Sequence, residues 1–246
     1  WLHSKLTTAG EVNALGVFLQ EFTQKTQVIC YLKEQSALAN SRYSTSLKFG
    51  SSRSFEQHIR ECSPGITYFN HFETLSRWSK FTNGNDLSCR IFSKQDLDKG
   101  SIFTDFLNQL NIVHDNDSWL EPSALNQSFS FKGALIFRAL NETLAGSKIP
   151  LKHKQVLSEA LAGSHNFVTE AEYNRISEAF SSSNEAVRKF FFPNREVLFK
   201  ARKNFCETDL LEAELYPKFL ASIKAILARS ENQFNEDVVQ EICNLA

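Results

Sequence analysis

One unbroken apolar run, QVICYL at residues 27–32, constrains the fold of this 246-residue chain more than any other feature. It has the length of one β-strand, and its continuous apolarity is typical of a strand covered on both faces, as in a parallel sheet. A second strand-like segment, LSCRIFS, follows at residues 87–93. Helix-like segments precede, separate and follow the two runs. This order predicts an α/β fold with a parallel sheet, because a crossover helix returns the chain to the same end of the sheet.

The surrounding segments carry apolar residues at helical spacing and recognisable start signals. In residues 8–24, Thr8 is placed to cap a helix, with Glu11 three residues later as its capping-box partner. Ser101 is a similar cap for the segment SIFTDFLNQLNI. The predicted helices of this half are residues 8–24, 34–48, 66–82 and 101–112, and the sequence NGND at 83–86 predicts a turn.

Strand signals stop at about residue 115, and the remaining chain has the pattern of helices. We therefore predict two parts: an α/β core over residues 1–114 and an α-helical portion over 115–246. The phenylalanine-rich segment KFFFP at 189–193 is expected to close the core of the helical portion.

Composition excludes several classes of function. The net charge of −1 gives no overall field that would attract nucleic acid or an anionic membrane. No apolar run approaches the ~18–20 residues needed to span a bilayer. The five cysteines have no metal-ligand spacing, and the pattern favours reduced thiols in a cytoplasmic protein over disulfides. Apart from His58 and Cys62, the histidines pair with no carboxylate or cysteine at i,i+4, so we expect no metal site.

The end of the first predicted strand carries the strongest candidate chemistry. Lys33 follows the strand directly, and Ser41 follows eight residues later in a helix-like segment. A fixed cation, hydroxyl donors and helix N–H groups together favour an anion such as a phosphate. In open α/β sheets, ligands bind beyond the carboxyl ends of the strands, where Lys33 is expected. The alternative is that Lys33 is a solvated lysine and Ser41 a serine on the helix surface.

The segment YLKEQSALANSRY at residues 31–43 resembles the 3′-phosphate-binding segment of the sulfotransferase superfamily, whose sulfate donor is 3′-phosphoadenosine 5′-phosphosulfate, PAPS. The resemblance implies that Lys33, where the family usually has arginine, and Ser41 bind the 3′-phosphate. The segment LSCRIFSKQDLDKGSIFTDFLNQLNI resembles the later strand, turn and helix that brace the superfamily's sheet. LHSKLTTAGEV resembles the His-x-His-Ser-Arg/Lys-Leu stretch of bacterial sulfotransferase-like proteins found with polysaccharide biosynthesis genes. LNQSFSFKGALIFRALN and SNEAVRKFFFPNREVLF resemble the helical tail of that group.

This resemblance implies a parallel sheet of the P-loop type and transfer of a sulfuryl group from PAPS to a hydroxyl of a carbohydrate-type acceptor. His3 would be the general base, with Lys5 as a possible helper for the anions, and no metal would be required. His3 could equally be a terminal histidine without a role in catalysis. The superfamily's donor loop, which cradles the 5′-phosphosulfate, has no counterpart here, so we expect it upstream of Trp1.

Two other functions stay open on the sequence. A related P-loop kinase or a nucleotide-dependent enzyme that transfers a glycosyl group could use the same phosphate site. A sulfotransferase-like module could also bind a glycan or a partner protein without catalysis. Arg195 could likewise reach a phosphate, or it could have a surface or capping role.

Overall fold

The computed structural model describes residues 5–82, 86–112, 127–146, 149–207, 209–231 and 233–246. Contacts divide the chain into two compact units, and each unit is assembled from three separate segments of the chain. The first unit takes residues 1–35, 62–123 and 175–201, and the second takes 36–61, 124–174 and 202–246. The domain boundary predicted at residue 114 lies outside the described residues.

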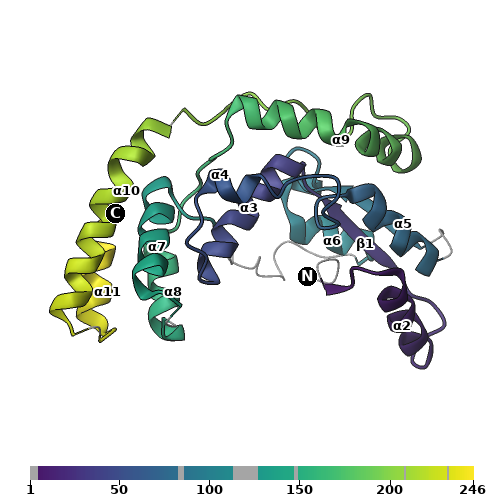
Figure 1. The fold of residues 1–246 in the computed structure, drawn as a ribbon. Helices are drawn as coiled ribbons and strands as arrows, with labels where there is room; N and C mark the ends of the chain where they lie inside the picture. The colour runs from purple at the N-terminus through teal and green to yellow at the C-terminus, as the bar shows by residue number, and fades with distance from the viewer. Residues whose placement is uncertain (1–4, 83–85, 113–126, 147–148, 208, 232) are drawn as a thin grey trace. The chain divides into compact units, whose positions relative to one another are not determined.

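The first unit contains the sheet (Figure 1). Its described elements are α2 (Ala9–Gln20), β1 (Val28–Leu32), α5 (His71–Phe81), β2 (Leu87–Ile91), the short 3-10 helix η1 (Asp98–Gly100), α6 (Ile102–Gln109) and α9 (Glu170–Phe191) from residue 175 onward. Strands β1 and β2 pair in parallel, with Cys30 opposite Cys89 and Leu32 opposite Ile91. The predicted α/β class and parallel pairing are therefore confirmed. Within the described residues this sheet has two strands.

The two faces of the sheet differ in chemistry, because successive side chains of a strand point to opposite faces. One face carries Leu32 and Ile91, which pack in a buried cluster with Leu75 of α5, Val187 of α9 and the nearby Leu198. The apolar run seen in the sequence supplies this face, and the cluster covers it.

The segment KFFFP was expected in the core of the helical portion, and this expectation was wrong. Phe191 and Phe192 pack instead against the apolar cluster of the first unit, which also contains the strand residues. Phe190 is 72 % exposed. Phe190 and Phe191 are the last two residues of α9 and Phe192 follows the helix, and the second and third of these rings pack on the sheet's apolar cluster.

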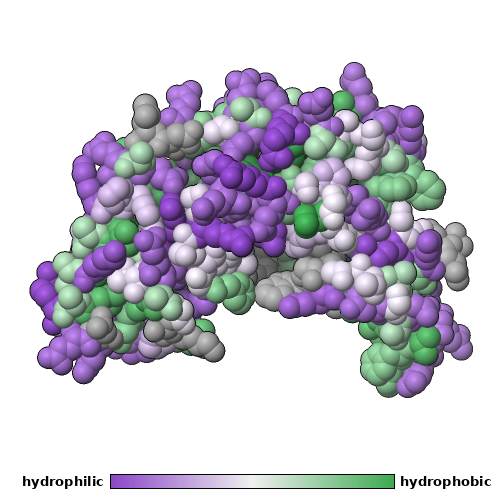
Figure 2. Space-filling model, in the orientation of Figure 1, coloured by the Kyte–Doolittle hydropathy of each residue, from purple (hydrophilic) through white to green (hydrophobic). Residues whose placement is uncertain are grey.

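Helix α2 forms as the sequence predicts. The backbone N–H of Glu11 donates to Thr8 Oγ1 at 3.2 Å, and the Thr8 N–H donates to Glu11 Oε2 at 2.8 Å, which completes the capping box. Gly16 lies so close to the Phe81 ring of α5 that a Cβ atom there would stand 2.5 Å from it. The opposite side of the helix is exposed and apolar, as Figure 2 shows over α2; its exposed residues include Val17, Phe18 and Phe22.

Two further helix starts of the first unit have side-chain caps. Ser101 caps α6 as predicted, because the N–H of Thr104 donates to its Oγ at 3.3 Å. Helix α5 begins at His71, later than the predicted residue 66, because Asn70 caps it by accepting from the Glu73 N–H at 3.2 Å. The predicted turn at 83–86 lies mostly outside the described residues.

The second unit is helical in its described part, as predicted for the C-terminal portion. Its elements are α3 (Gln35–Lys48) after the first residue, α4 (Phe55–Ile59), α7 (Phe131–Leu144), α8 (Leu151–Ala160), the start of α9, α10 (Asp209–Arg229) and α11 (Glu236–Cys243). Helix α7 is buried along most of its length and packs against α10. Across the parts of the chain described, no helix is both long and apolar enough to cross a membrane.

The core of the second unit is rich in aromatic rings. Tyr43, Phe55 and Phe167 form a buried trio with ring centroids 5.3 to 5.4 Å apart. Phe129 and Phe137 stack at 4.8 Å. Such pairs contribute about 0.5–1.5 kcal/mol each beyond the burial of their area. The many phenylalanines at helical spacing thus serve packing in this unit.

Candidate functional site at the carboxyl end of the parallel strands

Lys33 stands where the sequence predicts, directly beyond the last residue of β1. Its Nζ atom lies 5.7 Å from the ring centroid of Phe92, the residue directly beyond β2. The Phe92 N–H donates to the Leu32 carbonyl at 2.7 Å, which continues the strand pairing to this edge. A cation over an aromatic ring within about 6 Å is attracted by the ring's quadrupole. The ammonium group is therefore held over the carboxyl edge of the sheet.

The backbone around Lys33 is fixed by two side chains of the same unit. His71 Nε2 donates to the Lys33 carbonyl at 2.7 Å, and the His71 ring lies edge-on to Phe199. The buried Gln35 amide exchanges two hydrogen bonds with the Asn184 amide of α9, at 2.7 and 3.1 Å. These bonds fix the point at which the Lys33 side chain leaves the backbone at the edge of the sheet.

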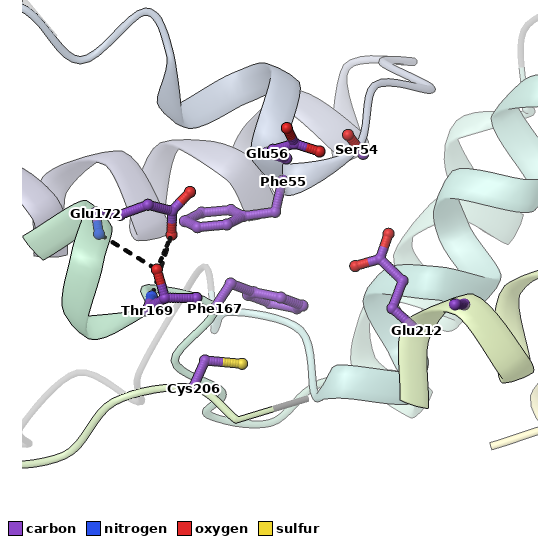
Figure 3. A pocket seen from close by; sticks show the side chains of 9 residues that line it. Ser54, Phe55, Glu56, Phe167, Thr169, Glu172, Cys206 and Glu212 are labelled. Carbon is purple, nitrogen blue, oxygen red and sulfur yellow. Dashed lines mark hydrogen bonds between the residues drawn. The ribbon is translucent and has the colours of Figure 1, made fainter. Parts of the chain in front are cut away.

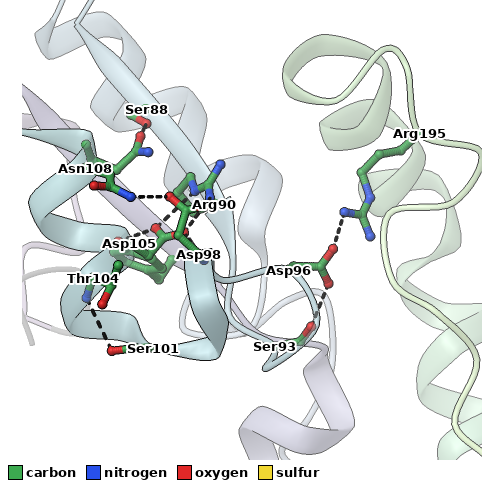
Figure 4. Close-up of polar contacts among 12 residues, drawn as sticks. Ser88, Arg90, Ser93, Asp96, Asp98, Ser101, Thr104, Asp105, Asn108 and Arg195 are labelled. Carbon is green, nitrogen blue, oxygen red and sulfur yellow. Dashed lines mark hydrogen bonds and ion pairs between the residues drawn. The ribbon is translucent and has the colours of Figure 1, made fainter. Parts of the chain in front are cut away.

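The loop after β2 carries an ion pair (Figure 4). Arg195 donates through Nη1 to Asp96 Oδ1 at 2.6 Å, and Ser93 Oγ donates to Asp96 Oδ2 at 2.6 Å. Burial alone would raise the pKa of Asp96, but the hydrogen bonds from Arg195 and Ser93 outweigh it and hold this pKa below its usual value. Lys200 Nζ donates to the Gln95 side chain at 3.2 Å. Arg195 thus holds this loop, a role that differs from both of those left open by the sequence.

A second polar cluster of the first unit braces the sheet from its other face (Figure 4). Asp105 of α6 is fully buried and accepts from Tyr31 Oη at 2.8 Å, from Arg90 Nε at 3.1 Å and from the Asp98 N–H at 3.1 Å. Burial opposes ionisation of Asp105, but the bonds from Arg90 and Tyr31 prevail, so its pKa is lowered. Burial and the bond to Asp105 raise the pKa of Tyr31. This cluster orients the strands rather than facing their carboxyl edge.

Of the other predicted site residues, Lys5 belongs to the same unit as Lys33, whereas Ser41 belongs to the other unit. His3 lies outside the described residues. Lys5 is exposed, shortly before α2. Ser41 is half-buried on α3 and belongs to the second unit, whereas Lys33 belongs to the first. The catalytic role of His3 and the phosphate role of Ser41 therefore stay predictions.

Sequence reasoning missed the two aspartates that organise this region. Asp96 follows Ser93 by three residues, a spacing that allows a turn, and Asp105 lies within the first turn of α6. These two positions in the sequence are weak signals, because the main partner of each aspartate is distant in sequence: Arg195 for Asp96 and Tyr31 for Asp105. Tyr31 and Arg90 lie opposite each other on one face of the two strands, and this shared face is a further sign that a polar partner covers it.

Among the residues that the structure describes, no group of three or more His, Cys, Asp or Glu side chains could hold a metal ion. None of the five cysteines, all of which are described, forms a disulfide. Burial raises the pKa of Cys30 to about 11 and raises that of Cys89 as well, so both thiols stay protonated at neutral pH.

The fold and this edge define an α/β protein with a fixed cation beyond a parallel strand pair. No protein-family model matches the chain, and no solved structure matches it. The chain is similar to an uncharacterized protein of Archaeoglobus fulgidus, with 26 % identity over 217 residues. The similarity covers 81 % of this chain and 58 % of the archaeal protein, so the chain spans little more than half of that relative.

Proposed function

We propose that the protein transfers a sulfuryl group from PAPS to a hydroxyl of a carbohydrate-type acceptor. The observation that carries this proposal is the position of Lys33, whose ammonium lies over Phe92 at the carboxyl edge of the parallel strands. In α/β sheets this edge is where ligands bind. This position supports the role that the resemblance of residues 31–43 to the 3′-phosphate segment of sulfotransferases gives to Lys33, as ligand of the 3′-phosphate.

The remaining roles follow from the resemblance to sulfotransferases. Ser41 shares the 3′-phosphate, the sheet is of the P-loop type, and the reaction takes place in the cytoplasm without a metal. In the transfer, an acceptor oxygen forms a bond to sulfur while the bond from sulfur to the phosphate oxygen of PAPS breaks. Adenosine 3′,5′-bisphosphate leaves, and His3 takes the acceptor's hydroxyl proton. Catalysis then consists mainly of positioning and charge stabilisation.

Lysine in place of the family's arginine has a physical consequence. Lys33 offers a point charge with three donors, whereas arginine offers a planar fork that matches two phosphate oxygens. We therefore expect weaker and less directional binding of the 3′-phosphate than an arginine would give. The cation–π contact with Phe92 compensates in part, because it limits the positions of the ammonium group.

Calorimetric titration of the full-length protein with adenosine 3′,5′-bisphosphate tests the proposal. Charge-assisted hydrogen bonds contribute about 1.5–3 kcal/mol, so Lys33→Ala should weaken binding about ten- to a hundredfold. Lys33→Arg should bind at least as tightly as the wild type. Lys80→Ala, an exposed lysine in the last turn of α5, is the matched control and should change nothing.

Adenosine 5′-monophosphate, which lacks the 3′-phosphate, distinguishes the open alternatives. If it binds as tightly as the bisphosphate and its binding also depends on Lys33, a P-loop kinase or glycosyl-transferring enzyme replaces the sulfotransferase. If the folded protein binds neither nucleotide, the enzyme proposals fail and a glycan- or protein-binding module is left. Bisphosphate binding that survives Lys33→Ala would refute the assigned site.

A further inference from the structure

A cavity of about 500 Å³ lies inside the second unit, beside the start of α4, the start of α9 and the first turns of α10 (Figure 3). Its volume falls within the range of small-molecule sites. All of the cavity's lining belongs to the second unit, whereas the edge that carries Lys33 belongs to the first. The lining residues are Ser54, Phe55, Glu56, Phe167, Thr169, Glu172, Cys206, Glu212 and Ala213.

The lining carries negative charge without a lysine, arginine or histidine among its nine residues. Glu172 and Glu212 stand on opposite sides of the cavity in Figure 3, and Glu56 lies at a third position. Glu56 is ion-paired with Arg60 and Glu212 with Arg138, so the negative charge that acts on a ligand is mainly that of Glu172. This charge repels phosphate and sulfate groups and attracts cations. The cavity therefore does not suit the nucleotide proposed for the first unit.

Each carboxylate has a partner that fixes its position. Glu212 Oε1 accepts from Arg138 Nη1 at 2.7 Å. Glu172 Oε2 accepts from the N–H of Thr169 at 3.1 Å and from its hydroxyl at 3.0 Å, in the manner of a capping box at the start of α9. Because Glu172 pairs with neutral donors, its charge is not neutralised by these bonds.

Aromatic rings also line the cavity. Phe55 and Phe167 line the cavity with ring centroids 5.4 Å apart, and both rings are buried in the trio with Tyr43. Carboxylates beside phenyl faces form the combination that binds organic cations, because the negative ring faces and the carboxylates both attract positive charge. A hydrated metal ion would gain nothing from the rings.

We propose that this cavity binds a small organic cation, with an ammonium or guanidinium group carried on an apolar or ring-shaped body. The charged group lies near Glu172, and the body contacts Phe55 and Phe167. This site does not depend on the proposed sulfotransferase function, because it lies in the other unit and selects the opposite charge.

Benzylamine and benzyl alcohol test the charge requirement, since they have nearly the same size and differ in charge at neutral pH. Titration of the full chain, followed by NMR or calorimetry, should show benzylamine binding about fivefold more tightly than benzyl alcohol, an advantage of the size expected for a carboxylate and ring site. Added salt should reduce this advantage. Equal affinities, or no binding of either probe to the folded protein, would overturn the proposal.

The variant Glu172→Gln locates the site. Glutamine also serves in a capping box, so this change keeps the start of α9 and removes only the charge. Glu170→Gln is the control, because Glu170 is exposed in the same turn, carries the same charge and does not line the cavity. Benzylamine binding should weaken about fivefold in Glu172→Gln and not in Glu170→Gln. An equal effect of the two variants would refute the site.

Discussion

The two units differ in whether a carboxylate is buried among their described residues. Besides neutral groups such as the Gln35 amide, the first unit buries an ionised carboxylate, Asp105, and satisfies it with Arg90, Tyr31 and a backbone N–H. The second unit buries neutral groups: the amide of Asn141 donates to the carbonyls of Leu47 and Ser51, both at 2.8 Å. The difference indicates which substitutions destabilise each unit most. A buried charge that loses its partner lowers the free energy of unfolding far more than a buried neutral group that loses its partner.

His58 shows the same preference of the second unit for neutral groups. The ring is buried, lies 5.5 Å from the Tyr43 ring, and its Nε2 atom has no hydrogen-bond partner within the described residues. Burial, with a smaller contribution from the charge of Arg42, lowers the pKa of His58 to about 4. The folded protein therefore holds this imidazole neutral.

The largest expected effect comes from removal of the buried carboxylate. Asp105→Ala leaves the Tyr31 hydroxyl without its acceptor and leaves Arg90 with the more distant Asp98 carboxylate, and we expect a loss of about 3 kcal/mol in the free energy of unfolding. Urea unfolding followed by the fluorescence of Trp78, which is buried on α5 of the first unit, measures it. Asp98→Ala is the control, because its ion pair with Arg90 at 3.5 Å is partly exposed and should contribute less than about 1 kcal/mol. Equal losses would mean that the buried network does not brace the sheet.

The second prediction concerns pH. The pKa of His58 is lower in the folded state than its ordinary value of 6.5, so the unfolded chain binds the extra proton first. The contribution of the neutral His58 ring to the free energy of unfolding is complete above pH 6.5 and is lost as the pH falls toward 4. We expect a loss of about 2 kcal/mol between pH 7.5 and pH 5. His58→Leu should flatten this part of the stability profile, and an unchanged profile would show that another group causes it.

The smallest effect comes from two asparagine caps, one in each unit. Asn70 caps α5, is buried, and also donates to the Pro64 carbonyl at 3.1 Å. Asn235 caps α11 through one bond, from the Val238 N–H at 3.0 Å, and is exposed. We expect Asn70→Ala to cost about 2 kcal/mol and Asn235→Ala about 1 kcal/mol. Thermal unfolding compares them, and the reverse order would show that burial does not set the strength of these caps.

Much of the fold was predictable because its signals are local. The apolar run of β1, the capping box of Thr8 and Glu11, and the cap at Ser101 each involve neighbours within a few residues. The start of α5 was predicted five residues too early, because Asn70 and Glu73 form a cap that the aromatic pattern of residues 66–70 obscured. Parallel pairing followed from the order of elements alone.

The candidate site was predictable only at Lys33, because that residue is defined by the end of a strand. The ion pair of Asp96 with Arg195 and the bond of Asp105 to Tyr31 join segments that are far apart along the chain. No spacing pattern in the sequence indicates a partner so far away along the chain. The cavity of the second unit was missed for the same reason, since α4, α9 and α10 each contribute part of its lining.

The interleaving of the two units along the chain has a consequence for synthesis and for fragments. The first unit needs the strands near the beginning of the sequence and also residues 175–201, which supply Val187 and Leu198 to the cluster on the sheet. On the ribosome, the sheet's apolar face therefore lacks Val187 and Leu198 until all of the second unit's α7 and α8 have been translated. Exposed strands at that stage invite aggregation, so folding should depend on chaperones, and no cut at one position can release either unit whole.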